Sequence, residues 1–183
     1  MSQTSVQEST KIQFGSGKFE VSVDGVEWID LGAMRNIVWN ESWEKVTVKS
    51  DNAGIIKTKI KNHQATLGGD VMELNLEKLN VVRGGIDEYE TTPGVSETLS
   101  SGGKTTITPI QAKVTNENEV GEIFRATLFK ASNNKGIEIN FQPDDADDPN
   151  MVAIEMQGDL DVTRDKGKQL FELYNEQGES VSS

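Results

Sequence analysis

The sequence predicts a mainly β protein, an antiparallel β-sandwich or barrel of two packed sheets with one short flanking α-helix. Three observations predict this fold class. Apolar and polar residues alternate with the period of a half-buried strand over much of the chain. Clusters of glycine, asparagine and aspartate separate several of these segments. Only one segment has the apolar spacing of a helix.

The alternating segments define the expected strands. They lie at residues 19–23, 26–29, 37–39, 43–49, 55–67, 110–115, 123–129, 137–142, 152–156 and 170–174. Asp24-Gly25 predicts a two-residue type I′ turn between the first two strands, because both central residues of that turn need a positive φ. The cluster at 50–54 predicts the turn of a second hairpin. The strand after it is expected to break near Asn62.

The strand at 123–129 differs from the others because it is apolar on both sides. Phe124, Ala126 and Leu128 share one side, whereas Ile123 and Phe129 lie on the other. This pattern allows two interpretations. Either a second subunit covers one face of the strand, or the strand is central in the core of a monomer.

The helical segment begins after Leu74. Asn75 is a suitable N-terminal cap, and Gly84-Gly85 is a suitable stop. Between them, Leu76, Leu79 and Val82 recur at three-residue spacing. The sequence therefore favours a strand that ends near Leu74 and a short helix after it. The alternative is a helix that begins a turn or more earlier, with Asp70 and Glu73 as its capping box.

The domain organisation is expected to be simple. Residues 14–175 form a single domain, between a flexible arm at 1–13 and a flexible tail at 176–183. Residues 84–104 are rich in Gly, Thr, Ser and Glu, and we expect them to form a long irregular loop. Residues 1–10 lack a positive cluster and an apolar run, so they do not resemble a signal peptide.

Composition excludes several classes of function. The chain has no cysteine, which rules out disulfides and cysteinyl metal sites and suits folding in a reducing cytoplasm. Its 30 acidic and 18 basic residues give a net charge of −12. Such a surplus of carboxylates repels nucleic acids and anionic membranes. No stretch approaches the length of about 20 apolar residues that spans a bilayer, so we expect a soluble protein.

The residues needed for common enzyme chemistries are missing or isolated. His63 is the single histidine, and no serine lies in a nucleophile elbow that could use it as a base. The segment 101–105 is similar to part of a phosphate-binding loop, but it lacks the upstream glycine and the strand-to-helix setting. A pair of carboxylates acting on a glycoside stays possible, because their separation is set only in three dimensions. The sequence favours a non-enzymatic protein without cofactors.

A run of aspartates near residue 146 forms an acidic loop, made of Asp144, Asp145, Asp147 and Asp148. Clustered carboxylates can bind calcium, but these are adjacent rather than alternating, and no downstream glutamate closes a site. A solvated acidic turn is the favoured interpretation, and no metal site is expected.

Several short segments resemble the tail tube proteins (major tail proteins) of long-tailed bacteriophages, in particular the siphophage type. Residues 23–32 resemble the opening hairpin of that family. Residues 50–54 are similar to its acidic, glycine-containing turn between long strands, and residues 73–85 to its passage from strand to helix. The resemblance covers about the first 90 residues, and the later strands agree in pattern only.

The resemblance implies a structural virion protein. Family members are β-sandwiches flanked by a helix, and they stack as hexameric rings in which hairpins from neighbouring subunits form a continuous inner β-barrel. The implied partners are further copies of the chain, a tape-measure protein, tail-tip and terminator proteins, and double-stranded DNA that passes through an acidic lumen without specific binding. No membrane partner is implied. The protein would be made in the host bacterial cytoplasm and reside in the phage tail.

The candidate assembly contacts lie at hairpins and turns. They are Asn40, Glu41, Ser42, Asp51, Asn52, Asn116, Glu117 and Asn118. We expect the polar faces of residues 39–49 and 110–129 to line the inner wall. Residues 1–13 and 84–104 are expected to make contacts between rings and to become ordered on assembly.

A different class of protein fits the same pattern of strands. An immunoglobulin-like or carbohydrate-binding β-sandwich from a virion or surface protein would share the strands and turns, but it would be monomeric and would present a ligand-binding face. Its mass in solution would distinguish it from a tube subunit.

Overall fold

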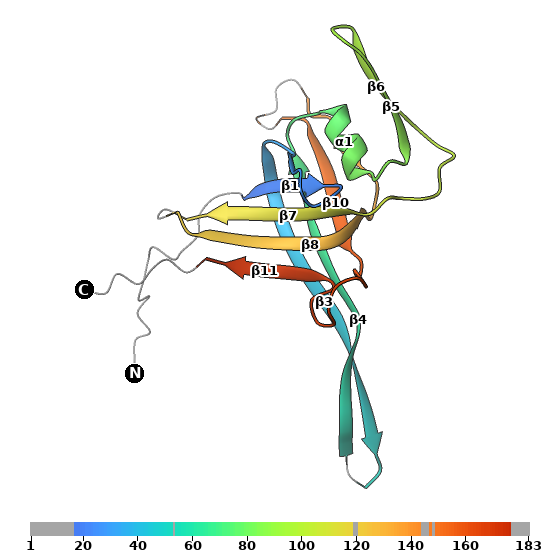
Figure 1. Ribbon diagram of the computed structural model, residues 1–183, viewed down its shortest axis with the longest axis vertical. Coiled ribbons are helices and arrows are strands. Elements are labelled where there is room, and N and C mark those ends of the chain that lie inside the picture. The colour runs from blue at the N-terminus through green and yellow to red at the C-terminus, as the bar shows by residue number, and fades with distance from the viewer. Residues whose placement is uncertain (1–16, 53, 119–120, 144–146, 148, 177–183) are drawn as a thin grey trace, which may run out of the picture.

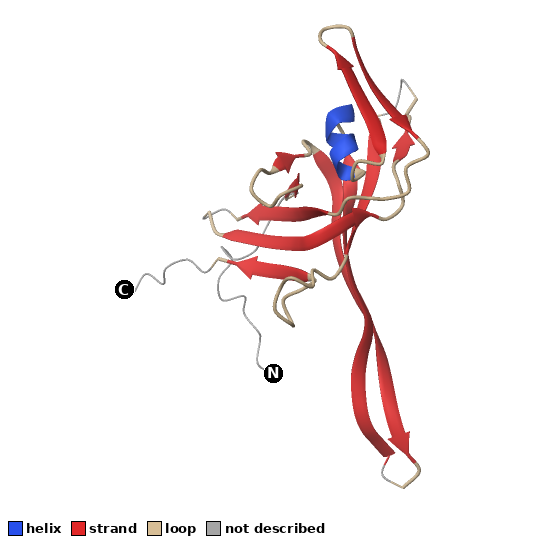
Figure 2. Cartoon of the chain, turned by 45° about the vertical axis from the view of Figure 1, so that its right-hand side comes forward, coloured by secondary structure: helices blue, strands red, loops and turns tan. Residues whose placement is uncertain are grey.

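The structure is a computed structural model of the 183-residue chain, and it describes residues 17–52, 54–118, 121–143, 147 and 149–176. This part of the chain contains eleven strands and one helix (Figures 1 and 2). In chain order they are β1 (Lys18–Ser22), β2 (Ile29–Asp30), β3 (Met34–Ser50), β4 (Gly54–Val71), α1 (Leu76–Val82), β5 (Asp87–Thr92), β6 (Ser96–Ser101), β7 (Ile110–Glu117), β8 (Ile123–Asn133), β9 (Glu138–Asn140), β10 (Met151–Gly158) and β11 (Phe171–Asn175). The mainly β fold class predicted from the sequence is confirmed.

Strand β8 joins the two halves of a nine-stranded sheet. One of its edges pairs with β7, from Ile123 to Ala131. Its other edge pairs first with β11, over Phe124–Leu128, and then with β10, over Ala131–Asn133. The sheet therefore continues on one side through β7, β1 and β2, and on the other through β10, β4 and β3. The two halves cross steeply and face each other (Figure 1).

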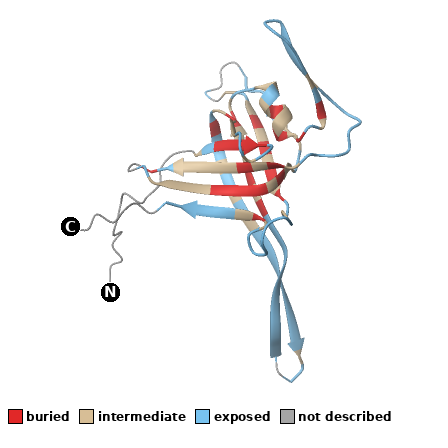
Figure 3. Cartoon of the chain, in the orientation of Figure 1, coloured by how far each residue is buried: buried red, intermediate tan, exposed pale blue. Residues whose placement is uncertain are grey.

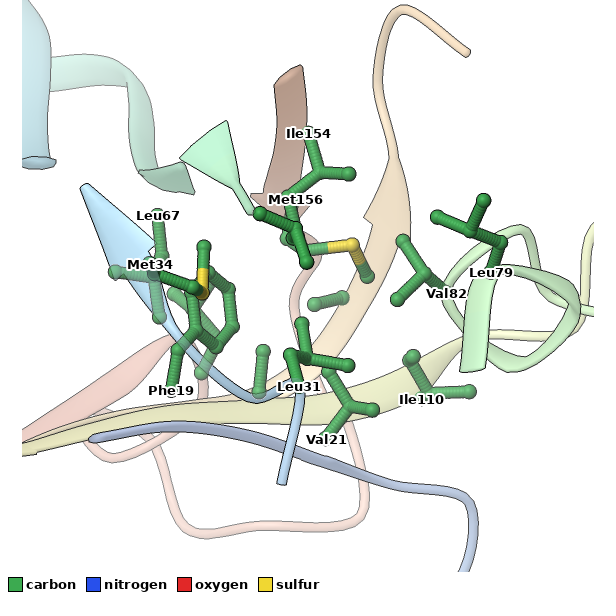
Figure 4. Close-up of a cluster of buried hydrophobic side chains, with 14 of the residues drawn as sticks. Phe19, Val21, Leu31, Met34, Leu67, Leu79, Val82, Ile110, Ile154 and Met156 are labelled. Carbon is green, nitrogen blue, oxygen red and sulfur yellow. The ribbon is translucent and has the colours of Figure 1, made fainter. Parts of the chain in front are cut away.

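The space between the two halves holds the hydrophobic core (Figure 4). Phe19 and Val21 of β1 face Leu67 of β4 and Met156 of β10 across it, and all four side chains are fully buried. Helix α1 closes one end with Leu79 and Val82. The strand positions follow from the alternation of apolar residues along each strand, and the helix positions from the three-residue spacing of Leu79 and Val82.

The ends of helix α1 are those that the sequence predicts. The Asn75 side chain accepts a hydrogen bond of 2.9 Å from the backbone N–H of Lys78, as an N-terminal cap does. Gly84 has a φ of 67°, and its N–H donates to the carbonyl of Val81. A left-handed glycine ends the helix because it can take this conformation without a Cβ clash.

Strand β8 is buried on both faces within one chain. Its residues from Ala126 to Phe129 are all buried, although their side chains alternate between the two faces of the sheet. On the side away from the core, the Arg164 guanidinium lies 3.4 Å from the centre of the Phe129 ring. Burial in a single chain therefore accounts for the apolar character of both sides of this strand.

Three sequence predictions are wrong. Asp24-Gly25 does not form a two-residue turn, because residues 23–28 form the connection between β1 and β2. For the same reason the return strand is not at 26–29 but at Ile29–Asp30. The Asp24 carboxylate accepts hydrogen bonds from the N–H groups of Val26 and Glu27, which stabilises this longer loop. The segment 84–104 is not irregular, since it contains the β5–β6 hairpin. Alternation fails to reveal these strands because most of their residues are exposed on both faces.

No helix in the described part of the chain is long and apolar enough to cross a membrane, since α1 has seven residues.

Phe19 provides a test of the core. We expect Phe19→Ala to lower the free energy of unfolding by about 3–5 kcal/mol, because it removes a fully buried ring that cannot be replaced by neighbouring atoms. Urea denaturation measures the change. The control is Val26→Ala at a side chain that is 79% exposed, where the change should stay within about 0.5 kcal/mol. Equal losses in the two variants would contradict the assigned core.

Candidate assembly surface

The most distinctive surface is a long two-stranded ribbon, residues 43–61 of β3 and β4, here called the arm. It extends far from the body, and almost all of it is exposed (Figures 1 and 3). Here β3 and β4 pair only with each other, because β10 joins β4 only from Thr66 onwards. Both outer edges of the arm therefore lack strand partners among the described residues. An isolated two-stranded hairpin is marginally stable in water.

A bulge at the base of the arm decides which side chains share a face. Ser42 lies opposite Gln64, but Glu44 lies opposite Lys61, so β4 has one more residue here than β3. Asn62 takes a positive φ of 52° within this bulge. The strand is therefore irregular where the sequence predicts a break, but β4 continues through it. Because strand side chains alternate, one extra residue moves every later side chain of β4 to the opposite face.

The consequence is a row of lysines on the outer face of the arm. Lys57, Lys59 and Lys61 lie opposite Val48, Val46 and Glu44, which continue the face of β3 that points away from the core. The inner face carries the pairs of Lys45 with Ile60 and of Thr47 with Thr58. Without the bulge, the lysine row would share the face of the core residues Leu67 and Ala65.

The arm is basic, although the chain is acidic. It contains five lysines and only two acidic residues, Glu44 and Asp51, whereas the net charge of the chain is −12. Among the described residues, none of the arm lysines lies within 4 Å of a carboxylate. The positive charge is therefore available to a partner.

The arm also exposes large apolar side chains. Exposed fractions range from 44% at Val46 to 63% at Ile56. The complete set is Trp43, Val46, Val48, Ile55, Ile56 and Ile60. Scattered apolar residues on a surface are ordinary, but six on one narrow ribbon without a core of its own are typical of an interaction surface.

Aromatic rings hold the root of the arm against the body. The centres of the Trp39 and Phe171 rings are 5.2 Å apart, and His63 lies edge-on to both Trp43 and Phe171, at 5.8 and 5.9 Å. His63 Nε2 is 2.7 Å from a carboxylate oxygen of Glu41. These contacts fix the direction in which the arm leaves the body.

The root does not resemble a catalytic centre. A hollow of about 290 Å³ beside it is lined by His63, Leu160, Gly167, Gln169, Leu170 and Phe171, so His63 is the only titratable group in its wall. The described residues contain no group of three or more histidine and acidic side chains that could hold a metal ion.

A second exposed hairpin, β5–β6, projects from the end of the molecule opposite the arm (Figures 1 and 2). Leu99 packs against the edge of the core, so the opposite face, with Glu88, Glu90 and Thr98, points outwards. The strands and their turn contain four acidic residues and no lysine or arginine. The two hairpins therefore carry opposite charge.

An ion pair anchors the acidic hairpin to helix α1. The Arg83 guanidinium donates from Nε and Nη2 to the two carboxylate oxygens of Asp87, and Nη2 also donates to Ser101 Oγ. The Asp87 side chain is fully buried. Burial favours its neutral form, but the hydrogen bonds from Arg83 and Ser101 and the charges of Arg83 and Lys104 outweigh burial and hold the pKa of Asp87 below its ordinary value.

The structure places the predicted assembly residues in three separate regions. Asn40, Glu41 and Ser42 lie in β3 at the root of the arm, and Asp51 and Asn52 lie at its tip. Asn116, Glu117 and Asn118 lie where β7 ends and turns towards β8.

The third region differs because Asn118 serves the turn itself. It is buried, and its side chain accepts from the N–H of Glu122 and donates to the carboxylate of the same residue. Of the acidic loop, Asp147 is described and exposed, whereas Asp144, Asp145 and Asp148 lie outside the described residues. The expected arm at 1–13 also lies outside them, and of the expected tail at 176–183 only Glu176 is described.

Sequence reasoning missed the lysine row and the apolar side chains of the arm as candidate contacts. The signal was present, since lysines at alternate positions 57, 59 and 61 put three like charges on one face of any strand. Their assignment to the outer face needed the position of the bulge.

Comparison with known proteins gives a likeness of fold alone. Neither a protein-family model nor a curated protein sequence matches the chain. Among solved structures, the tube terminating cap of the anti-feeding prophage is similar, with a TM-score of 0.57 and 8% identity over 96% of this chain and 100% of that one. A second match is a chain from the six-fold symmetrised baseplate structure of the same prophage. Its TM-score is 0.45, with 13% identity over 80% of this chain and 91% of that one.

The first of these comparisons supports the fold. The chain shares its overall fold with the tube terminating cap, and the match covers all of the cap chain. The described arrangement of strands and helix is therefore one that a solved protein also adopts.

Asp87 provides a test of the anchor of the acidic hairpin. Asp87→Asn leaves the Arg83 guanidinium, whose side chain is 14% exposed, without its counter-charge, and we expect a loss of about 3 kcal/mol. Hydrogen exchange of the β5 and β6 amides and urea denaturation measure it. Asp165→Asn, at an exposed loop residue, is the control and should change neither.

The same pair predicts a dependence on pH. Because the folded-state pKa of Asp87 is lowered, its contribution is complete above the unfolded-state value of about 4 and is lost as the pH falls through the folded-state pKa. The difference in stability between wild type and Asp87→Asn should therefore shrink below about pH 4. A difference that stays constant down to pH 2 would contradict the ion pair.

Proposed function

We propose that this chain is a non-enzymatic structural subunit of a phage-tail-like particle, and that it assembles with copies of itself into a ring through the arm. The observation that carries the proposal is the arm itself. It is a long ribbon with six exposed apolar side chains, and among the described residues neither of its edges has a strand partner and no core lies beneath it. Pairing with the arms of neighbouring copies removes the free edges and buries the apolar residues.

Two independent observations agree on the kind of particle. The sequence resembles tail tube proteins over about its first 90 residues, and the fold is similar along its whole length to a tube terminating cap. A ring closed by rotation has no exposed edges, because each arm lies between two others. The ring of six copies, its stacking into a tube and the passage of double-stranded DNA through the lumen are part of this proposal, as are the tape-measure and tail-tip partners.

A terminal ring is the second candidate. The likeness to a tube terminating cap favours a ring that ends a tube over one that repeats along it. Electron microscopy distinguishes them, because a repeating subunit forms rods of variable length, whereas a terminal subunit forms single rings. Either product has a central channel. The siphophage type of tail remains a prediction of the sequence resemblance.

The apolar residues of the arm provide the test. We expect Ile56→Ser with Ile60→Ser to reduce the assembled species to monomer, because it removes apolar area that only a neighbouring copy can cover. Light-scattering mass and negative-stain electron microscopy across a range of concentrations measure assembly. The free energy of unfolding of the monomer should change by less than about 0.5 kcal/mol, since both side chains are exposed.

The matched control is Val26→Ser with Val162→Ser, which removes two apolar side chains that are 79% and 77% exposed but lie outside the arm. This variant should assemble as wild type does. Two outcomes contradict the proposal: the arm variant keeps the wild-type mass, or the wild-type chain is monomeric at every concentration. The second outcome favours the monomeric ligand-binding sandwich.

A further inference from the structure

The two projecting hairpins lie at opposite ends of the molecule and carry opposite charge (Figures 1 and 2). The arm presents Lys57, Lys59 and Lys61 of β4 on one face. Val46 and Val48 of the paired strand β3 lie beside them on the same face. The β5–β6 hairpin presents Glu88 and Glu90 on the face turned away from the body. Since the two ends of one chain cannot meet each other, their charges can be matched only between molecules.

The two acidic side chains on the outward face of β5–β6 are available to a new partner. Among the described residues, Glu90 has no cation within 4 Å, and it is exposed. Glu88 is held by Lys104 at 2.7 Å, but 71% of its side chain remains exposed. An exposed pair of this kind contributes little, so its exchange for another lysine costs little.

We propose that the lysine face of the arm docks on the outward acidic face of the β5–β6 hairpin of a second copy of this chain. The contact joins different surfaces of the two copies, so it is head-to-tail and can repeat from copy to copy. This inference rests on the proposed function, because it assigns the contact between successive subunits or rings. It names the surface that the arm contacts, the β5–β6 hairpin, and the electrostatic attraction that drives the contact.

The docking also bears on the passage of a polyanion. An arm whose lysines faced a channel would bind DNA rather than let it slide, because each lysine neutralises a phosphate and releases a counterion. Covering the lysine row with glutamates of the next copy removes that attraction. The basic arm is then compatible with an otherwise acidic chain.

Disulfide trapping tests the contact directly, because the natural chain has no cysteine. Val46→Cys lies opposite Lys59 on the lysine face, and Thr98→Cys lies opposite Glu90, so neither change removes a charge. We expect an equimolar mixture of these two full-length variants to form a mixed disulfide dimer under mild oxidation. The matched control pairs Thr98→Cys with Thr47→Cys, which lies on the opposite face of the arm and should react at least about tenfold more slowly.

Salt and charge reversal identify the driving force. Raising NaCl to about 1 M shortens the Debye length to about 3 Å and should slow the Val46–Thr98 reaction several-fold while leaving the control pair unchanged. Adding Lys59→Glu to the first variant should have the same effect. Adding Glu90→Lys to the second should then restore the rate. Failure of this restoration would overturn the charge pairing.

The outcome separates this inference from the proposed function. If wild-type protein forms rings or tubes but the Val46–Thr98 pair reacts no faster than the control, the head-to-tail contact is wrong and ring assembly stands. Selective cross-linking by a chain that forms no ring would support the contact and overturn the ring. A third outcome would overturn the docking. If wild type binds double-stranded DNA at low salt, and this DNA abolishes the cross-linking, the lysine face binds nucleic acid.

Discussion

The whole architecture depends on one strand, β8, that has a different partner at each end of the same edge. Strand β8 pairs with β7 along one edge, and its other edge changes partner from β11 to β10 near residue 130. The change turns the sheet through a steep angle, so that the strands of each half face those of the other. All of the large core side chains, from Phe19 to Met156, occupy the space created by this turn. Loss of the β8–β10 pairing would open the core.

The arm is a continuation of this core, and this gives it its direction. Strand β3 begins in the sheet and runs out beyond it, and β4 returns from the tip of the arm into the sheet, where Ala65 and Leu67 are buried. The aromatic rings of Trp39, Trp43 and Phe171 mark the boundary. Beyond it, the bulge at Asn62 rotates the pattern of β4 by one residue. A ribbon that would have presented lysines on the core side presents them outwards instead.

The distribution of charge gives the molecule a polarity that its net charge hides. A net charge of −12 disfavours association between identical chains. A basic arm and an acidic β5–β6 hairpin at opposite ends create a local attraction within that general repulsion. Because Arg83 and Asp87 fix the acidic hairpin to helix α1, and aromatic contacts fix the arm, both charged surfaces are held by the body of the protein.

The sequence by itself determined the elements whose residues repeat a simple pattern. Alternation located most of the buried strands, because one face of each packs on the core, and Asn75 with Gly84 defined helix α1. An irregularity near Asn62 was also predictable, although β4 continues through it as a bulge. The β5–β6 hairpin escaped, because strands exposed on both faces have no need to alternate.

Only the tertiary structure decided how distant segments combine. It set the change of partner along β8, which joins residues more than 20 positions apart in the chain. It also set the length of the unsupported arm and the face on which Lys57, Lys59 and Lys61 lie. These features follow from the pairing of whole strands, and the register of a pair depends on both strands and on the core that they share.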